Sequence, residues 1–229
     1  MITDAHKRYR LKPTEDWPKG EIVPGVTTIT RQLGWATESL VKWANNLGLK
    51  GIDSRRFTDD KADIGTLGHQ MVMDYLQKQQ TDTKNYTAEQ IKQAENVLLS
   101  FFEWEKGHKI EPIFFELKLV SEKYRYGGSC DMIAAIDGNK ELIDIKTGGV
   151  WPEHYVQVGG GYYQLLVENG ICKVIENKVV NIEIKKVRLL NLPRTEDEAF
   201  KDILVPNLDL CWEVFLHCRQ LYDLQKRFK

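Results

Sequence analysis

The stretch that most constrains the fold lies between residues 111 and 147, where three strand-like segments follow one another. They are EPIFFELKLVSE (111–122), YRYGGSCDMIAAID (124–137) and KELIDIKT (140–147). Their β-branched and aromatic residues favour strands. Asp137-Gly138-Asn139 separates the last two segments and is typical of a tight hairpin turn. We therefore expect a meander of strands at the centre of the molecule.

Helical patterns flank this meander on both sides. Helices are predicted over 37–48, 65–80, 87–107, 151–170 and 207–226, and a further strand pair around 171–177 and 179–190. The helix over 87–107 opens with a Thr87/Gln90 capping box, and in the helix over 37–48 we expect Leu40, Val41, Trp43 and Ala44 to face inward. This order predicts an α/β fold with a mixed central β-sheet flanked by helices. We expect one domain over 1–229, mainly helical in 1–107, with the sheet core and a closing helix in 108–229.

The composition is that of an ordinary globular protein. The chain has 229 residues, of which 42% are hydrophobic, and a net charge of −1, which neither favours nor excludes a nucleic-acid partner. No apolar run approaches the ~18 residues of a membrane span, and the N-terminus lacks the pattern of a secretory signal. The four cysteines form no CxxC pair, so we expect buried thiols in a reducing cytoplasm, with no membrane contact.

Two charges interrupt the third strand. Asp144 and Lys146 are two positions apart, so in a strand they share one face about 7 Å apart along the chain. On the preceding strand, alternation places Asp131 on one face and Cys130 with Met132 on the other. The hairpin brings Asp131 close to Asp144, and two such carboxylates repel unless a positive charge lies between them. Magnesium or manganese suits these oxygen ligands, and Glu116 is a third acid that can join them.

The same residues carry a family resemblance. GGSCD at 127–131, followed by DIKT at 144–147, resembles the core of the PD-(D/E)XK nuclease superfamily in its RecB-like exonuclease branch. That branch includes phage recombination and repair exonucleases and mitochondrial genome maintenance exonucleases. It also carries an upstream histidine, a glutamate on the preceding strand and a Gln-x-x-x-Tyr motif, which correspond here to His69, Glu116 and Gln157. With an N-terminal PGVTTITRQLG similar to the branch's SVTTIL segment, the resemblance covers roughly residues 22–168.

The resemblance implies a restriction-endonuclease-like fold and a Mg²⁺- or Mn²⁺-dependent deoxyribonuclease, specifically an exonuclease in phage or bacterial DNA recombination or repair. The metal ligands would be His69, Asp131, Asp144 and the backbone carbonyl of Ile145. Lys146 would orient or deprotonate the attacking water, and Glu116 and Gln157 would steady the arrangement. A phage or host recombination or replication protein is the partner that it implies beside DNA.

His69 and the expected DNA contacts have support in the sequence as well. Val72, Met73 and Leu76 follow His69 at helical spacing, so its imidazole lies on an inward, apolar face. A lone histidine there is commonly a core residue, but the downstream carboxylates favour a metal ligand. A nuclease also needs cations for the phosphates, and we assign DNA contacts to Lys118, Lys123, Thr147 and Tyr162.

Two departures from the branch support an alternative. The branch places a glutamate four residues after the histidine, where this chain has Met73. Four residues after Gln157 stands Gly161, with Tyr162 directly after it. The glycines at 159–161 imply a close backbone approach, by packed protein or by a nucleic-acid strand. The alternative is a catalytically inactive protein of this fold that binds nucleic acid or a protein partner; the retained Asp131, Asp144 and Lys146 favour the enzyme.

Overall fold

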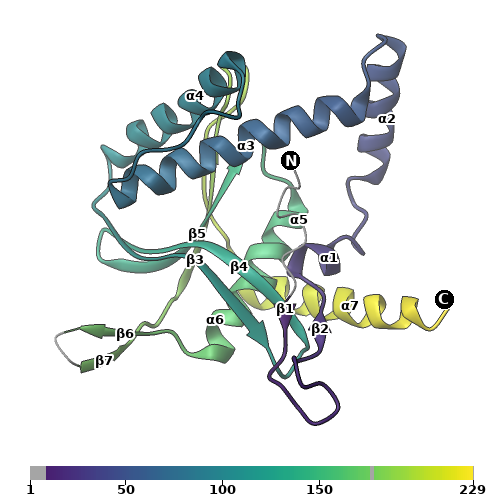
Figure 1. The fold of residues 1–229 in the computed structure, drawn as a ribbon, viewed down its shortest axis with the longest axis vertical. Coiled ribbons are helices and arrows are strands. Elements are labelled where there is room, and N and C mark those ends of the chain that lie inside the picture. Colours follow the sequence, from purple (N-terminus) through teal and green to yellow (C-terminus); the bar gives the residue numbers. More distant parts are fainter. Residues whose placement is uncertain (1–8, 176–177, 229) are drawn as a thin grey trace.

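The fold is an α/β arrangement in which helices flank a five-stranded mixed sheet (Figure 1). It is seen in a computed structural model that describes residues 9–175 and 178–228, without the side chains of 172–180. The sheet has the order β3-β4-β5-β8-β9, with β3 Ile110–Ser121, β4 Tyr126–Ile136, β5 Asn139–Thr147, β8 Lys186–Leu192 and β9 Lys201–Leu204. The pairs β3–β4, β4–β5 and β8–β9 are antiparallel, and β5–β8 is parallel. The predicted meander and mixed sheet are confirmed.

The sheet separates two hydrophobic cores. On one face it packs against α3 (Ser54–Gln77) and α4 (Ala88–Glu105). On the other it packs against α1 (Val26–Thr30), the helical segment formed by α5 (Pro152–Tyr155), η1 (Val156–Tyr162) and α6 (Tyr163–Asn169), and α7 (Leu208–Lys226). Strand β5 shows the alternation, because Leu142 lies in the core with α7 while Ile143 and Ile145 lie in the core with α3 and α4.

Local sequence explains several element boundaries. Asp137 and Gly138 have φ of 51° and 83°, as a two-residue hairpin turn with primed geometry requires, and Ile136 pairs with Asn139 across it. Helix α4 begins after Thr87, which forms the predicted capping box with Gln90. The remaining described strands in the N-terminal part are β1 (Tyr9–Arg10) and β2 (Ile22–Val23), which pair with each other.

Two helices differ from the prediction. Helix α3 begins eleven residues before the predicted start, because the side chain of Asp53 caps it by accepting the N–H groups of Arg55 and Arg56; the largely charged first turns hid this start. Helix α2 (Thr37–Leu49) occurs where predicted, but its expected inward face is wrong. Leu40 and Val41 are 57% and 65% exposed, and no residue of α2 is buried. Figure 1 shows α2 standing away from the sheet.

The predicted helix over 151–170 is helical throughout, but its middle, η1, is a π-helix. The glycines of η1 pack against helices. A Cβ on Gly160 would lie 2.4 Å from the carbonyl oxygen of Cys211 on α7, and one on Gly161 would lie 2.5 Å from Val26 on α1. The close approach is therefore protein packing, and it is made by helices on the face away from α3.

The strands after α6 also differ from the prediction. Instead of one pair, β6 (Cys172–Ile175) and β7 (Lys178–Asn181) form their own hairpin, and β8 continues into the main sheet beside β5. Residues 176–177 of the predicted pair lie outside the described residues. Strand β9 was not predicted, because only Ile203 and Leu204 of its four residues are apolar. Over the described residues, no helix is both long and apolar enough to cross a membrane.

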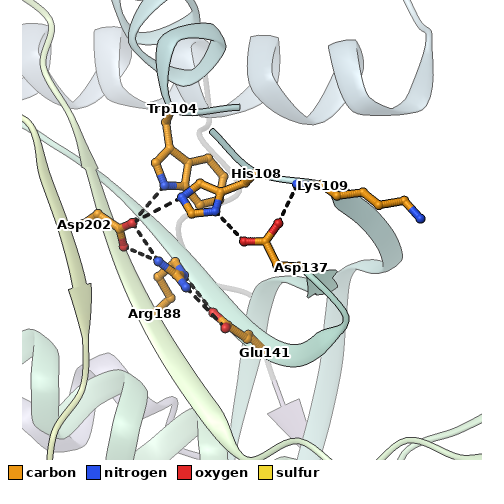
Figure 2. Close-up of polar contacts among 7 residues, drawn as sticks. All are labelled: Trp104, His108, Lys109, Asp137, Glu141, Arg188 and Asp202. Carbon is orange, nitrogen blue, oxygen red and sulfur yellow. Dashed lines mark hydrogen bonds and ion pairs between the residues drawn. The ribbon is translucent and has the colours of Figure 1, made fainter. Parts of the chain in front are cut away.

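A charged network ties β8 and β9 to the start of β5 (Figure 2). Arg188 contacts buried Glu141 through Nε at 2.7 Å and Asp202 through Nη1 at 2.5 Å. Trp104 Nε1 donates to Asp202 at 2.9 Å, and His108 Nδ1 lies 2.7 Å from Asp137 Oδ2 in the hairpin turn. Because Glu141 is near the beginning of β5, this network lies at the opposite end of that strand from Lys146 and Thr147.

Candidate active site

A cavity of about 1080 Å³ opens where the end of β5 meets α2 and α3. Six of the residues singled out in the sequence line it: His69, Glu116, Asp131, Ile145, Lys146 and Thr147. They come from four elements, α3, β3, β4 and β5, which the meander and the long α3 bring together. Of the three residues predicted to converge through the hairpin, Asp131 and Lys146 line the cavity, whereas Asp144 is buried outside its lining and contacts Lys146.

His69 and Asp131 contact each other across the gap between α3 and β4. His69 Nε2 lies 3.3 Å from Asp131 Oδ2, and the same oxygen accepts the N–H of Ile145 at 3.0 Å. Burial would raise the pKa of Asp131, but His69, Lys146 and the Ile145 N–H stabilise the carboxylate and hold its pKa below the usual value. Burial likewise opposes the charged imidazole, yet Asp131 and Asp144 leave the pKa of His69 above its usual value.

Asp144 and Lys146 pair with each other at the end of β5. Lys146 Nζ lies 2.6 Å from Asp144 Oδ2, and Asp144 is 1% exposed. Burial raises the pKa of Asp144 to about 6, against the attraction of Lys146. Burial alone would lower the pKa of Lys146, but Asp144 and Asp131 raise it above the usual value. The lysine is therefore charged at neutral pH, and it shields a carboxylate that is costly to ionise.

Two buried atoms of this group have no hydrogen-bond partner. They are His69 Nε2 and Asp144 Oδ2, whose close contacts with Asp131 and Lys146 lack hydrogen-bond geometry. Buried polar atoms in folded proteins are nearly always satisfied, so each such exception requires an explanation. An imidazole nitrogen and a carboxylate oxygen are donor types suited to Mn²⁺, and the carboxylates also suit Mg²⁺. The residues present therefore fit a divalent cation, although no three His, Cys, Asp or Glu side chains of the described chain already form a ligand cluster.

Glu116 reaches the cavity through an irregular backbone. It lies on β3 between the pairs Phe115–Met132 and Leu117–Cys130, which places it opposite Asp131. Its φ of 46° is left-handed, a conformation that costs a non-glycine residue of order 1–3 kcal/mol. The irregularity also breaks the predicted alternation on β4, because Cys130 packs in the core with Ile133 rather than in the one with Met132. The expectation that Cys130 and Met132 share a face was therefore wrong.

Several predicted residues lie outside the cavity lining. The amide of Gln157 donates to the hydroxyl of Tyr162 at 3.0 Å, and Tyr162 is a core residue. Lys118 Nζ lies 5.3 Å from the ring centre of Tyr9, and Lys123 Nζ 4.8 Å from that of Tyr124.

The position of the branch glutamate also lies in the core. Met73 is buried there, and the neighbouring Asp74 accepts a hydrogen bond from Gln70. Cys130, Cys211 and Cys218 are free and buried as expected, while the side chain of Cys172 lies outside the described residues.

The cavity also contains residues that the sequence reading missed. Lys61 and Arg194 add positive charge. Arg194 is paired with Glu198 and lies against Gly148, where a Cβ would clash with its guanidinium. His154 accepts the N–H of Trp151 at 3.2 Å, and burial, with help from Lys146, lowers its pKa to about 4, so it is neutral. The cavity is also lined by apolar side chains, which we call its apolar wall: Leu40, Trp43, Phe57 and Trp151. The WPEH run at 151–154, shortly after the third strand, was a sequence signal for Trp151 in this wall.

The sequence matches no known protein family and no curated protein. The candidate site therefore depends on its own geometry.

Proposed function

We propose that this protein is a metal-dependent deoxyribonuclease, specifically an exonuclease, with a restriction-endonuclease-like fold. One observation supports this above all. His69, Asp131 and Lys146, from three separate elements, line one cavity, and Lys146 contacts the buried Asp144. Two buried polar atoms of this group have no hydrogen-bond partner. A stable core gains nothing from such an arrangement, because buried charges lose hydration that their mutual attraction rarely restores.

Magnesium or manganese would be held by His69, the carboxylates of Asp131 and Asp144, and the backbone carbonyl of Ile145. When bound, such a cation neutralises phosphate charge and activates a water for attack on phosphorus. The side chains of His69 and Asp131 are 21% and 23% exposed, although His69 Nε2 itself is buried against Asp131, and Asp144 lies deeper. Cation binding would also relieve the repulsion between Asp131 and Asp144.

The chain's own residues supply orientation and charge. The Ile145 N–H fixes one oxygen of Asp131, which holds that carboxylate in place on β4. Lys146 lines the cavity with its charge retained, so it can bind a phosphoryl oxygen and stabilise the charge that develops there. Glu116 is exposed in the same cavity and can accept a proton from an attacking water.

The alternative is a catalytically inactive protein that binds nucleic acid or a protein partner through this cavity. The observation in its favour is that Gln157 bonds to Tyr162 in the interior and Met73 occupies the core, so neither position assists the cavity. Cytoplasmic action in a bacterium or from a phage, with a recombination or replication protein as partner, also remains a proposal.

The test is digestion of end-labelled linear single- and double-stranded DNA and of a closed circle, with magnesium, manganese or chelator. Asp144→Ala is compared with Asp74→Asn. Asp74 is a buried carboxylate on α3 that does not line the cavity, although Gln70, which donates a hydrogen bond to it, does. We expect the linear forms alone to shorten, only with metal, and only when Asp144 is present. Cutting of the circle would make the enzyme an endonuclease, and full activity in Asp144→Ala would refute the site.

A further inference from the structure

We infer that the apolar wall of this cavity is a stacking surface for unpaired bases, so that the protein takes a single-stranded DNA end. The inference rests on the proposed function for its DNA substrate. Its own basis is the apolar wall, which includes the rings of Trp43, Phe57 and Trp151. They come from α2, α3 and the segment before α5.

These rings are open to solvent although they lie inside a cavity. Trp43 is 39% exposed, Phe57 37% and Trp151 57%. Single exposed apolar side chains are ordinary, but a group of large rings gathered on one concave surface indicates a binding site. The cavity volume of about 1080 Å³ also exceeds what one small ligand requires, since such pockets span roughly 300–1,000 Å³.

Contacts at the middle and at the beginning of α2 hold the wall in position. The rings of Trp43 and Phe57 meet edge-to-face, with centres 6.0 Å apart, which joins α2 to α3. At the beginning of α2, the N–H of Ala36 donates to Glu153 Oε1 at 2.9 Å, which joins it to α5. Apart from such contacts α2 stands clear of the sheet (Figure 1), and its residues Leu40 and Trp43 line the cavity rather than a core.

Positive charge accompanies the rings. Lys61 Nζ lies 5.7 Å from the ring centre of Phe57, and Arg194 lines the same cavity. Of the acidic side chains that line the cavity, Asp131 and Glu116 lie with the proposed metal ligands, and Glu153 accepts the N–H of Ala36. Aromatic platforms beside cations are how proteins bind single strands without reading sequence, because every base has a face to stack and every nucleotide a phosphate. The cavity thus offers stacking for bases and cations for phosphates, next to Lys146.

A duplex offers this wall little. Inside a double helix each base face is covered by its neighbours, so that only base edges, phosphates and the outer face of the terminal pair are accessible. Stacking of successive bases on Trp43 and Trp151 therefore requires bases that are unpaired or frayed at an end. The structure favours a single strand as the DNA form bound in this cavity.

The first experiment measures binding apart from cleavage. Fluorescence anisotropy with a labelled oligonucleotide, single-stranded or as its duplex, is recorded in chelator for wild type, Trp43→Ala and Trp151→Ala. Trp17→Ala is the matched control, because Trp17 is 54% exposed but lies outside the cavity lining. We expect wild type to prefer the single strand and each cavity variant to bind it roughly 5- to 100-fold more weakly. The Trp17 control should bind as wild type does.

A second pair of variants distinguishes stacking from apolar contact. Trp43→Tyr keeps a ring that can stack and should retain most of the affinity, whereas Trp43→Leu should lose it as the alanine does. Equal binding by wild type and both alanine variants, or a preference for duplex, would overturn the inference. If the rings do not affect binding but DNA is cleaved with metal, the inference fails and the proposed nuclease function holds. If binding depends on the rings but no DNA is cleaved, the nuclease function fails and the inference about single-strand binding holds.

Discussion

Replacing Lys146 with methionine should destabilise the protein in a way that depends on pH. Lys146 Nζ lies 2.6 Å from the buried Asp144 carboxylate, whose pKa burial already raises to about 6. Without the lysine, the pKa of Asp144 in the folded state rises further, while its value in the unfolded chain is unchanged. Above pH 6 the wild-type Asp144 ionises. In the folded variant Asp144 must instead keep its proton or carry a buried negative charge without Lys146 beside it, and either case destabilises the fold.

The size of the effect follows from the pH at which it is measured. The carboxyl group can always take up a proton, so the cost is limited to about 1.4 kcal/mol for each pH unit above 6. At pH 7.5 this limit is about 2 kcal/mol, and at pH 5, where Asp144 is protonated with or without the lysine, it vanishes. Lys146→Met should thus lose up to about 2 kcal/mol more unfolding free energy at pH 7.5 than at pH 5.

Urea unfolding at both pH values, without divalent cations, measures this difference. The control compares Asp144→Asn with Asp144→Asn/Lys146→Met, where position 144 can no longer titrate. Any pH dependence that the methionine still shows there comes from other groups near Lys146, Asp131 among them, and is subtracted. If Lys146→Met costs the same free energy at pH 5 and pH 7.5 beside wild type, the lysine does not stabilise the Asp144 carboxylate, and our account of the pair is wrong.

Two further predictions concern stability. Arg188→Met removes the cation between buried Glu141 and Asp202 and should lower the free energy of unfolding in urea by about 3–5 kcal/mol. Lys185→Met, at an exposed lysine, should lower it little. Equal losses in the two variants would show that the network in Figure 2 does not stabilise the fold. Gly160→Ala places a Cβ 2.4 Å from a backbone oxygen of α7 and should cost about 1–3 kcal/mol. Gly48→Ala meets open space near the end of α2 and should instead raise stability by up to about 1 kcal/mol, so a stabilising Gly160→Ala would contradict the packing of η1 on α7.

The central sheet was predictable because its determinants are local. The Asp137-Gly138 turn fixes the register of β4 and β5, and that register brings Asp131 to Asp144 and Lys146. The capping box of α4 and the apolar stripe of α7 likewise depend on residues close together in the sequence. These signals placed the charged half of the cavity without any knowledge of the tertiary structure.

The apolar half was missed because it depends on tertiary position. Helix α2 has the apolar period of an ordinary core-facing helix, at Leu40, Val41 and Trp43. It nevertheless stands away from the sheet, and Leu40 and Trp43 line the cavity. Arg194 reaches the cavity from the segment after β8, more than forty residues beyond the third strand in the sequence. The hydrogen bond of Gln157 to Tyr162 depends on the π-helical geometry of η1, which places residues five apart on one side.

The most direct test of the central claim is the initial rate at which an end-labelled single-stranded oligonucleotide is shortened, measured against manganese concentration. Wild type is compared with Lys146→Ala and with Lys185→Ala, an exposed lysine on the segment before β8. We predict cleavage by wild type that rises with manganese and stops with chelator, an unchanged rate in Lys185→Ala and a loss of at least about a hundredfold in Lys146→Ala. Absence of cleavage under all these conditions, or equal rates in the three proteins, would contradict it.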